Sequence, residues 1–236
     1  MRFNELRKPI LSEGGNIFKG DLATRRILKD EVPPTIKFIE FEGVTGIKFP
    51  IKNWLGTTGR KESSGDLDLA VDSRQINKDA LFAKLVDWCK RNKVDPKDYV
   101  RKSGISVHFR CPIMGSAAKG FVQVDFMMTD NPDWMTWSMA ADQPSQYKDA
   151  DRQVLLASIA KAMGLRWIAQ TGLVTRDGNK LVANTPDVVV DTLFGPNAQP
   201  KDMKSVENIL ARLKNDPDRE AKLVDARGSL PHIKFD

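Results

Sequence analysis

Apolar and polar residues alternate along one short segment of the chain, and this pattern predicts a β-strand over Leu67–Val71. Successive side chains of a strand point to opposite sides, so the two leucines and the valine share one face. Asp66 and Asp68 share the other face, together with Asp72 at the end of the strand. The predicted strand therefore has one apolar face and one acidic face.

The same alternation predicts strands over residues 104–110 and 121–128. Residues 114–120, which are rich in glycine and alanine, fit a loop or hairpin connection between them. In the later strand the apolar side chains share a face, and Asp125 lies on the opposite one. Residues 48–55 are also predicted as a strand, which leads into a glycine-rich loop.

Apolar residues at helical spacing predict amphipathic helices over residues 78–90 and 151–163. Cys89 is expected on the apolar side of the first helix. The apolar stripe of the second helix consists of Val154, Leu155, Ile159 and Met163. Pro34 precedes residues 35–41, for which a helix is favoured over a short strand.

The last third of the chain predicts shorter elements. Residues 166–182 are typical of a β-hairpin that turns around a polar Asp-Gly pair. Thr185 and Pro186 suit the N-cap and the first position of a short helix. Two charged helical segments follow, near residues 203–213 and 217–225.

These elements predict an α+β protein, in which a mixed sheet with flanking helices carries the functional residues and a smaller region follows. We expect an N-terminal arm or helical segment over residues 1–45, a core over residues 46–150 and a C-terminal region over residues 151–236. The chain has 236 residues, of which 41% are hydrophobic, and this is enough to build such cores.

The formal net charge is +6, which favours anionic partners such as nucleotides or nucleic acid, although mildly basic proteins without such partners are common. The two cysteines and two histidines lack the spacing of a zinc site, and His108 is expected to be a satisfied strand residue. The first residues lack the apolar stretch of a signal peptide, and no apolar run reaches the roughly 18 to 20 residues of a membrane helix. We therefore expect a soluble cytoplasmic protein without a membrane partner.

Asp66 and Asp68 are the centre of the candidate chemistry. Residues two apart on a strand project to the same side, roughly 6.5 to 7 Å apart along the chain. Carboxylates this close repel each other, and bound cations relieve the repulsion. Mg²⁺ prefers hard oxygen ligands, which it shares with substrate phosphates. Asp125, on a separate strand, is the candidate third carboxylate, so two ions could clamp an in-line phosphoryl displacement. Asp72 is expected to be a solvated carboxylate.

The glycine-rich loop over residues 56–60 comes shortly before the acidic strand. Glycine lets the backbone approach an anion closely, and successive backbone N–H groups bind phosphate oxygens. A hydroxyl and a guanidinium in this loop add further donors. The candidate nucleotide-binding residues of the loop and of the turn that follows it are Gly56, Thr57, Arg60, Ser64 and Gly65.

The stretch from Gly56 to Asp68 resembles the signature of the DNA polymerase beta-like nucleotidyltransferase superfamily, in which a glycine loop precedes an Asp-x-Asp strand. Glu62-Ser63-Ser64-Gly65-Asp66-Leu67-Asp68 is especially similar to the palm motif of family X DNA polymerases, with a slightly shorter loop. The resemblance implies a palm-like core followed by a thumb-like region. It also implies that Asp66, Asp68 and Asp125 bind two Mg²⁺ ions, or Mn²⁺, and that Asp125 activates the attacking hydroxyl.

The similarity extends weakly over residues 46–215, and two departures limit what it implies. Residues 1–45 are too few for the helix-hairpin-helix modules of a repair polymerase. Trp134 and Trp137 stand near the place of an aromatic pair in those polymerases without matching it. These tryptophans could stack on a base, or they could pack in a core or at an interface.

The favoured function is transfer of a nucleoside monophosphate from a nucleoside triphosphate to a hydroxyl acceptor, with release of pyrophosphate. The acceptor could be an RNA or DNA end, or a protein. One alternative is a minimal family X-like DNA polymerase. Another is a catalytically inactive structural or interaction protein on the same fold, against which the three retained carboxylates argue.

Overall fold

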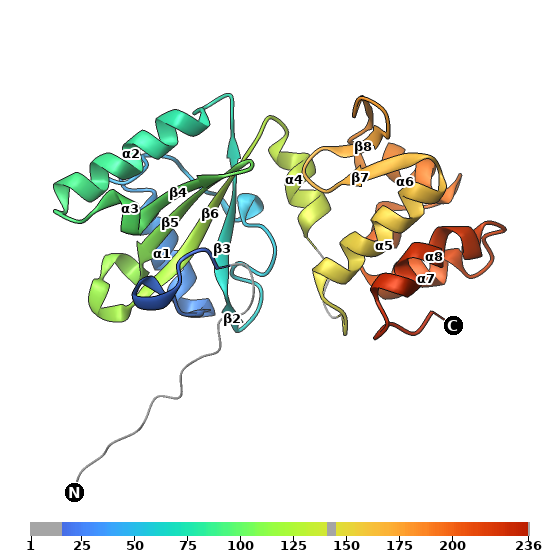
Figure 1. Cartoon of the computed structure of the whole chain (residues 1–236), viewed down its shortest axis with the longest axis horizontal. Coiled ribbons are helices and arrows are strands. Elements are labelled where there is room, and N and C mark those ends of the chain that lie inside the picture. Colours follow the sequence, from blue (N-terminus) through green and yellow to red (C-terminus); the bar gives the residue numbers. More distant parts are fainter. Residues whose placement is uncertain (1–15, 141–144, 236) are drawn as a thin grey trace, which may run out of the picture. The chain divides into compact units, whose positions relative to one another are not determined.

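The computed structural model describes residues 16–140 and 145–235, which form two compact units that meet in the sequence at Asp130 and Asn131 (Figure 1). Each unit has its own hydrophobic core and combines helices with a β-sheet, so the α+β class predicted from the sequence is confirmed. The boundary assigns residues 16–45 to the first unit, and residues 131–140 and 145–150 to the second.

A mixed four-stranded sheet forms the centre of the first unit, with the strand order β3-β6-β5-β4 (Figure 1). Three of its strands were predicted: β3 (Asp66–Asp72), β5 (Ser106–Pro112) and β6 (Phe121–Thr129). The fourth, β4 (Val100–Ser103), was not predicted, because its mostly polar residues show no alternation. Strand β3 is parallel to β6, whereas β5 is antiparallel to both β6 and β4.

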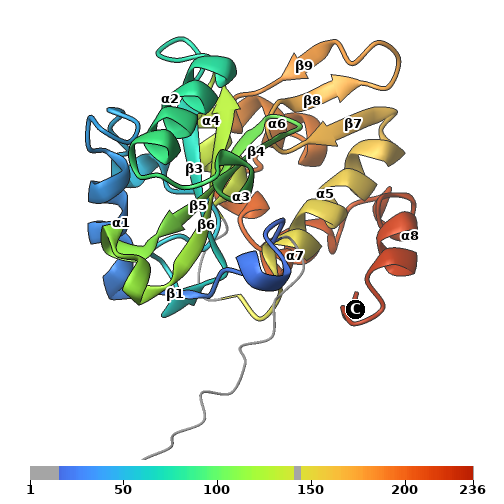
Figure 2. The same ribbon diagram turned by 60° about the vertical axis from the view of Figure 1, so that its left-hand side comes forward.

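The apolar face of this sheet packs against helices α1 (Val32–Ile39) and α2 (Lys78–Arg91) (Figure 2). Both helices agree with the sequence pattern, and Cys89 is buried on the apolar side of α2 as expected. A short helix that was not predicted, α3 (Pro96–Tyr99), leads into β4. Because the strands alternate, covering one face with helices leaves the polar side chains together on the other face.

The predicted strand over residues 48–55 is wrong. A 3-10 turn, Ile51–Asn53, replaces it, and the backbone N–H of Asn53 donates to the carbonyl of Pro50. Only Trp54 pairs with the sheet, through an isolated antiparallel bridge to Leu69. Proline at position 50 fixes φ and starts the turn, which interrupts the alternation that the sequence suggested.

The N-terminal segment passes beside the glycine-rich loop region. The expected arm over residues 1–45 lies partly outside the described residues, which begin at residue 16. Strand β1 (Ile27–Leu28) pairs antiparallel with β2 (Ser63–Ser64), a short strand that comes just before β3. This early segment therefore pairs with the residues that come shortly before the Asp-x-Asp strand β3.

The second unit contains a three-stranded antiparallel sheet and five α-helices among the described residues. In chain order they are α4 (Pro132–Met139), α5 (Asp149–Ala162), β7 (Leu165–Ile168), β8 (Gly172–Thr175), β9 (Leu181–Ala183), α6 (Pro186–Phe194), α7 (Val206–Leu213) and α8 (Arg219–Ser229). The predicted hairpin is thus extended by a third strand, and the predicted helices are present. None of the helices in the described parts of the chain combines the length and the apolar character needed to cross a membrane.

Two expectations for this unit meet different outcomes. The apolar stripe of α5 is partly wrong: Val154 and Met163 are exposed, whereas Leu156 is buried. The helix contacts both β7 and α8, so its buried face is broader and rotated from the predicted stripe. Trp134 is buried in the core and donates its indole N–H to the carbonyl of Ala169, which confirms core packing for this residue.

Candidate functional site

The polar face of the first sheet collects the candidate residues because the register of three strands aligns them. Residues directly opposite each other on neighbouring strands project to the same side. Two polar rows result, running from β3 through β6 to β5. The rows are Asp68–Asp125–His108 and Asp66–Gln123–Arg110.

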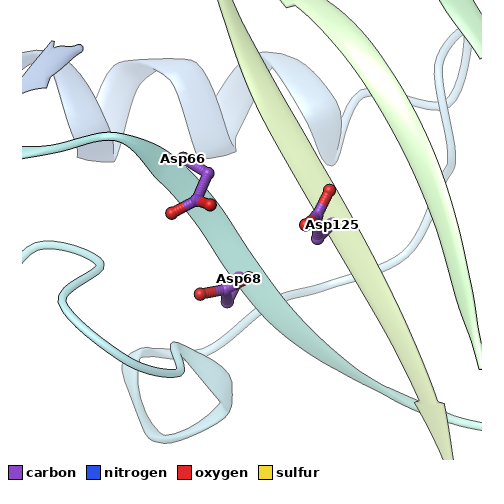
Figure 3. Close-up of side chains that lie close together, drawn as sticks. All are labelled: Asp66, Asp68 and Asp125. Atoms are coloured by element: carbon purple, nitrogen blue, oxygen red, sulfur yellow. The ribbon is translucent and has the colours of Figure 1, made fainter. Parts of the chain in front are cut away.

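The three predicted carboxylates lie together in this structure. Asp66 and Asp68 project from β3 and Asp125 projects from the adjacent β6 (Figure 3). One carboxylate oxygen of each residue lies within 4.8 Å of the others, and all three side chains are partly buried. The cluster could therefore hold a metal ion, as the sequence predicted.

Electrostatic repulsion is built into the cluster. Burial raises the pKa of Asp68 well above its usual range, and the negative charges of Asp66 and Asp125 raise it further. Within the described chain, hydrogen bonds to Asp68 reach its backbone N–H and carbonyl rather than its carboxylate. A cation bound among the three carboxylates would remove this repulsion, so the residues present suit a divalent ion.

The glycine-rich loop lies along the outer edge of β3 next to Asp68. The backbone N–H of Leu55 donates to the Asp68 carbonyl over 2.9 Å, and the Asp68 N–H donates to the Thr58 hydroxyl over 3.0 Å. Thr58 is buried, so these bonds fix the loop to the strand. The loop therefore takes the place of a neighbouring strand at this edge.

Gly56 brings the loop close to the carboxylate of Asp68. Its φ is +54°, a left-handed conformation that other residues adopt at a cost. A Cβ atom at this position would stand 3.0 Å from Oδ2 of Asp68. Glycine thus brings the loop backbone against the carboxylate of Asp68, and anion binding by this loop stays a prediction.

The other candidate phosphate-binding residues differ in exposure and in hydrogen bonding. The Thr57 hydroxyl donates to the Ser64 hydroxyl, which in turn donates to the Thr57 carbonyl. Ser64 is buried, so it fits a role in holding the loop closed. Arg60 is exposed and donates to the carbonyl of Trp54, at 3.3 Å. Gly65 follows in the turn that leads into β3.

Sequence reasoning missed Arg26, which lies against this turn. Its guanidinium donates to the carbonyl and the hydroxyl of Ser63, over 2.9 and 3.1 Å. A Cβ atom at Gly65 would lie 3.7 Å from Nη1 of Arg26. Arg26 reaches the turn through the β1–β2 pairing, which joins segments far apart in the sequence, so no local pattern could reveal it.

Two partners of Asp125 were also missed. His108 lies opposite Asp125 on β5, and its Nδ1 is 2.7 Å from Oδ1 of the carboxylate. Gln123 donates its side-chain amide to Oδ2 over 3.1 Å. Both ring nitrogens of His108 have hydrogen-bond partners, which confirms the expectation of a satisfied strand residue. Once the two strands are paired as a hairpin, the register places His108 beside Asp125.

Asp72 is separate from the cluster. Its carboxylate accepts two hydrogen bonds from the guanidinium of Arg74, over 2.8 and 2.7 Å. These bonds lower the pKa of Asp72, so it is an ion-paired residue and the expectation of a merely solvated carboxylate is wrong.

No protein-family model matches this chain, and no curated protein matches it.

Proposed function

We propose that this chain is a nucleotidyltransferase of the DNA polymerase beta-like type, which transfers a nucleoside monophosphate from a nucleoside triphosphate to a hydroxyl acceptor and releases pyrophosphate. The observation that carries the proposal is the convergence of Asp66, Asp68 and Asp125 beside the loop at Gly56. The similarity of the stretch from Gly56 to Asp68 to the palm motif supports the same conclusion. On this proposal the first unit is the palm-like core and the second is the thumb-like region.

The donor set suits two Mg²⁺ ions, with Mn²⁺ as a substitute. Carboxylate oxygens are the hard ligands that both ions accept, and three of them within 4.8 Å form a strongly anionic site. Asp66, Asp68 and Asp125 would hold the ions together with oxygens of the triphosphate. When bound, the cations lower the pKa of the attacking hydroxyl and neutralise charge on the phosphates.

The chain itself binds and orients the triphosphate through its loop. Gly56 lets phosphate oxygens approach the backbone, since it carries no side chain where the loop meets the Asp68 carboxylate. The Thr57 hydroxyl, which donates to Ser64 in this structure, would turn to donate to a phosphate oxygen. Arg60 and Gly65 complete the proposed phosphate contacts, with Arg60 turning from the Trp54 carbonyl toward the nucleotide.

Asp125 has a different part from the Asp-x-Asp pair. It projects from β6, between β3 and β5, and both of its oxygens accept hydrogen bonds from the protein. A carboxylate held in this way keeps its position when the acceptor binds. We assign Asp125 to the acceptor side of the site, where the attacking hydroxyl loses its proton.

The test is a labelling experiment with a panel of acceptors. The protein is incubated with each nucleoside or deoxynucleoside triphosphate labelled at the α-phosphate, with Mg²⁺ or Mn²⁺, and with tRNA, single-stranded DNA, primed DNA or a protein acceptor. We expect label on at least one acceptor, lost in Asp66→Asn and Asp68→Asn. Asp72→Asn is the matched control from the same strand and should keep the activity, because Asp72 pairs with Arg74 outside the cluster.

The acceptor that is labelled decides between the remaining functions. Labelling confined to primed DNA, and only with the complementary nucleotide, would identify a minimal template-directed polymerase. If no acceptor is labelled in a reaction that depends on Asp66 and Asp68, the proposal is contradicted. That result would favour an inactive structural or interaction protein.

A further inference from the structure

Both carboxylate oxygens of Asp125 form hydrogen bonds with neighbouring strand residues. Nδ1 of His108 lies 2.7 Å from Oδ1, and Nε2 of Gln123 donates to Oδ2 over 3.1 Å. Both partners are almost fully buried, His108 at 7% exposure and Gln123 at 1%. An oriented carboxylate leaves its remaining lone pairs in fixed directions, which is what a metal ligand requires.

A second hydrogen bond fixes the imidazole itself. Nε2 of His108 lies 2.7 Å from the hydroxyl oxygen of Ser103, on the neighbouring strand β4. A neutral imidazole has one donor nitrogen and one acceptor nitrogen, whereas an ionised carboxylate only accepts. Because the carboxylate only accepts, its hydrogen bond to His108 places a proton on Nδ1. The carboxylate thus selects the tautomer, and the Ser103 hydroxyl, which can donate or accept, holds Nε2 in place.

The hydrogen-bonded chain Ser103–His108–Asp125, called the relay below, is aligned by the pairing of the strands. His108 and Asp125 are directly opposite on the antiparallel strands β5 and β6, so their side chains share the polar face. Gln123 lies two residues before Asp125 on the same face, and its Oε1 accepts from the backbone N–H of Ile17 over 2.8 Å. Three strands and the N-terminal segment thus converge on a single carboxylate.

We propose that His108 is a positioning residue for Asp125, and that Ser103 steadies the imidazole through its other ring nitrogen. The inference rests on the proposed function, because it assigns the relay to the orientation of a cation ligand. His108 touches neither the triphosphate nor the acceptor. It acts through Asp125, by holding Oδ1 so that the carboxylate meets a cation shared with Asp68 without reorganisation.

The first test compares two substitutions of His108 by the affinity of the full chain for Mn²⁺, measured by electron paramagnetic resonance without nucleotide. His108→Asn keeps an N–H donor near the place of Nδ1, whereas His108→Leu has similar bulk and no donor. Removing a hydrogen-bond partner of a metal ligand typically weakens binding by roughly 10 to 100-fold. We expect a loss of this size in His108→Leu and recovery of most of it in His108→Asn.

The second test reads the tautomer directly in the full chain. The two histidines, His108 and His232, are separated in long-range proton–nitrogen correlation spectra by comparison with His232→Gln. We expect the proton of neutral His108 on Nδ1. Ser103→Ala alters an exposed residue and leaves the core intact, and the proton should stay on Nδ1, because the Asp125 carboxylate still accepts it.

Each outcome bears on the relay separately from the proposed function. Equal Mn²⁺ affinity in His108→Leu and the unaltered protein would overturn the relay, and so would an Nε2 proton in the unaltered protein. If instead the unaltered protein binds no Mn²⁺ and Asp125→Asn changes nothing, the proposed function fails as well. An Asp125-dependent Mn²⁺ site that ignores His108 would leave the proposed function standing without the relay.

Discussion

Replacing Asp68 with asparagine should stabilise the cation-free protein, although it destroys the proposed site. Three carboxylates lie within 4.8 Å of one another, and the two neighbours of Asp68 raise its pKa. At that separation a pair of like charges repels by roughly 1 kcal/mol in water and by roughly 3.5 kcal/mol at an effective dielectric constant of 20. The side chains are partly exposed, so we expect Asp68→Asn to add about 1 to 3 kcal/mol to the free energy of unfolding.

The assay is thermal or urea unfolding of the two proteins, followed with and without Mg²⁺. A ligand at a hundred times its dissociation constant stabilises the folded state by about 2.7 kcal/mol. The unaltered protein should gain this increment in Mg²⁺, whereas Asp68→Asn should lose most of it. The difference between the free energies of unfolding of the two proteins should therefore shrink or change sign when the cation is added.

A matched substitution on the same strand separates this effect from the loss of any negative charge. Asp72 pairs with Arg74 and lies outside the cluster, so Asp72→Asn should destabilise slightly and keep the full response to Mg²⁺. The reasoning is refuted if Asp68→Asn is no more stable than the unaltered protein without cations. It is refuted equally if both substitutions leave the same response to Mg²⁺.

The pH dependence supplies a second reading of the same cluster. The pKa of Asp68 is raised in the folded state by burial and by Asp66 and Asp125, so the folded state holds a proton that the unfolded state releases. The cation-free protein should lose stability as the pH rises from the usual range of an aspartic acid through this raised pKa. Asp68→Asn should show a smaller loss over the same range.

Two further predictions concern the loop beside the cluster, and a third concerns the N-terminal segment. Gly56→Ala should cost roughly 1 to 2 kcal/mol of stability and weaken Mn²⁺ binding, because its φ is +54° and the new Cβ meets Asp68 at 3.0 Å; unfolding and titration curves check both effects. Thr58→Val should cost roughly 1 to 3 kcal/mol in urea unfolding, since the Asp68 N–H loses its buried acceptor, and an unchanged midpoint would contradict the role of this hydroxyl. Arg25 lowers the pKa of Glu31. At pH values above the usual pKa range of a glutamic acid, Glu31→Gln should therefore lower the free energy of unfolding by about 1 kcal/mol. The difference should vanish as the pH falls through the lowered pKa of Glu31, and a difference that persists in acid would exclude the ion pair as its cause.

The central strands and their acidic residues could be predicted because the signal is local. A strand repeats every two residues, so the sequence alone places Asp66 and Asp68 on one face and Asp125 on the polar face of another strand. The glycine at position 56 is similarly recognisable before a strand. What brings Asp125 to Asp68 is the parallel pairing of β3 with β6, which the sequence pattern did not specify.

The supporting contacts could not be predicted, because they depend on long-range pairing. The bond between His108 and Asp125 depends on the register of β5 and β6, and Arg26 reaches the turn through the pairing of β1 with β2. The strand expected over residues 48–55 failed for a different reason. Pro50 starts a turn there, and only Trp54 continues into the sheet. Apolar alternation alone does not register such a break.

The most direct test of the account is a crystal structure of the full chain with Mn²⁺ and a non-hydrolysable nucleoside triphosphate analogue, with the ions located by anomalous scattering. We predict manganese peaks between the carboxylates of Asp66, Asp68 and Asp125, with the triphosphate along the loop that begins at Gly56. A nucleotide bound elsewhere, or carboxylates without manganese when the ion is saturating, would contradict the account.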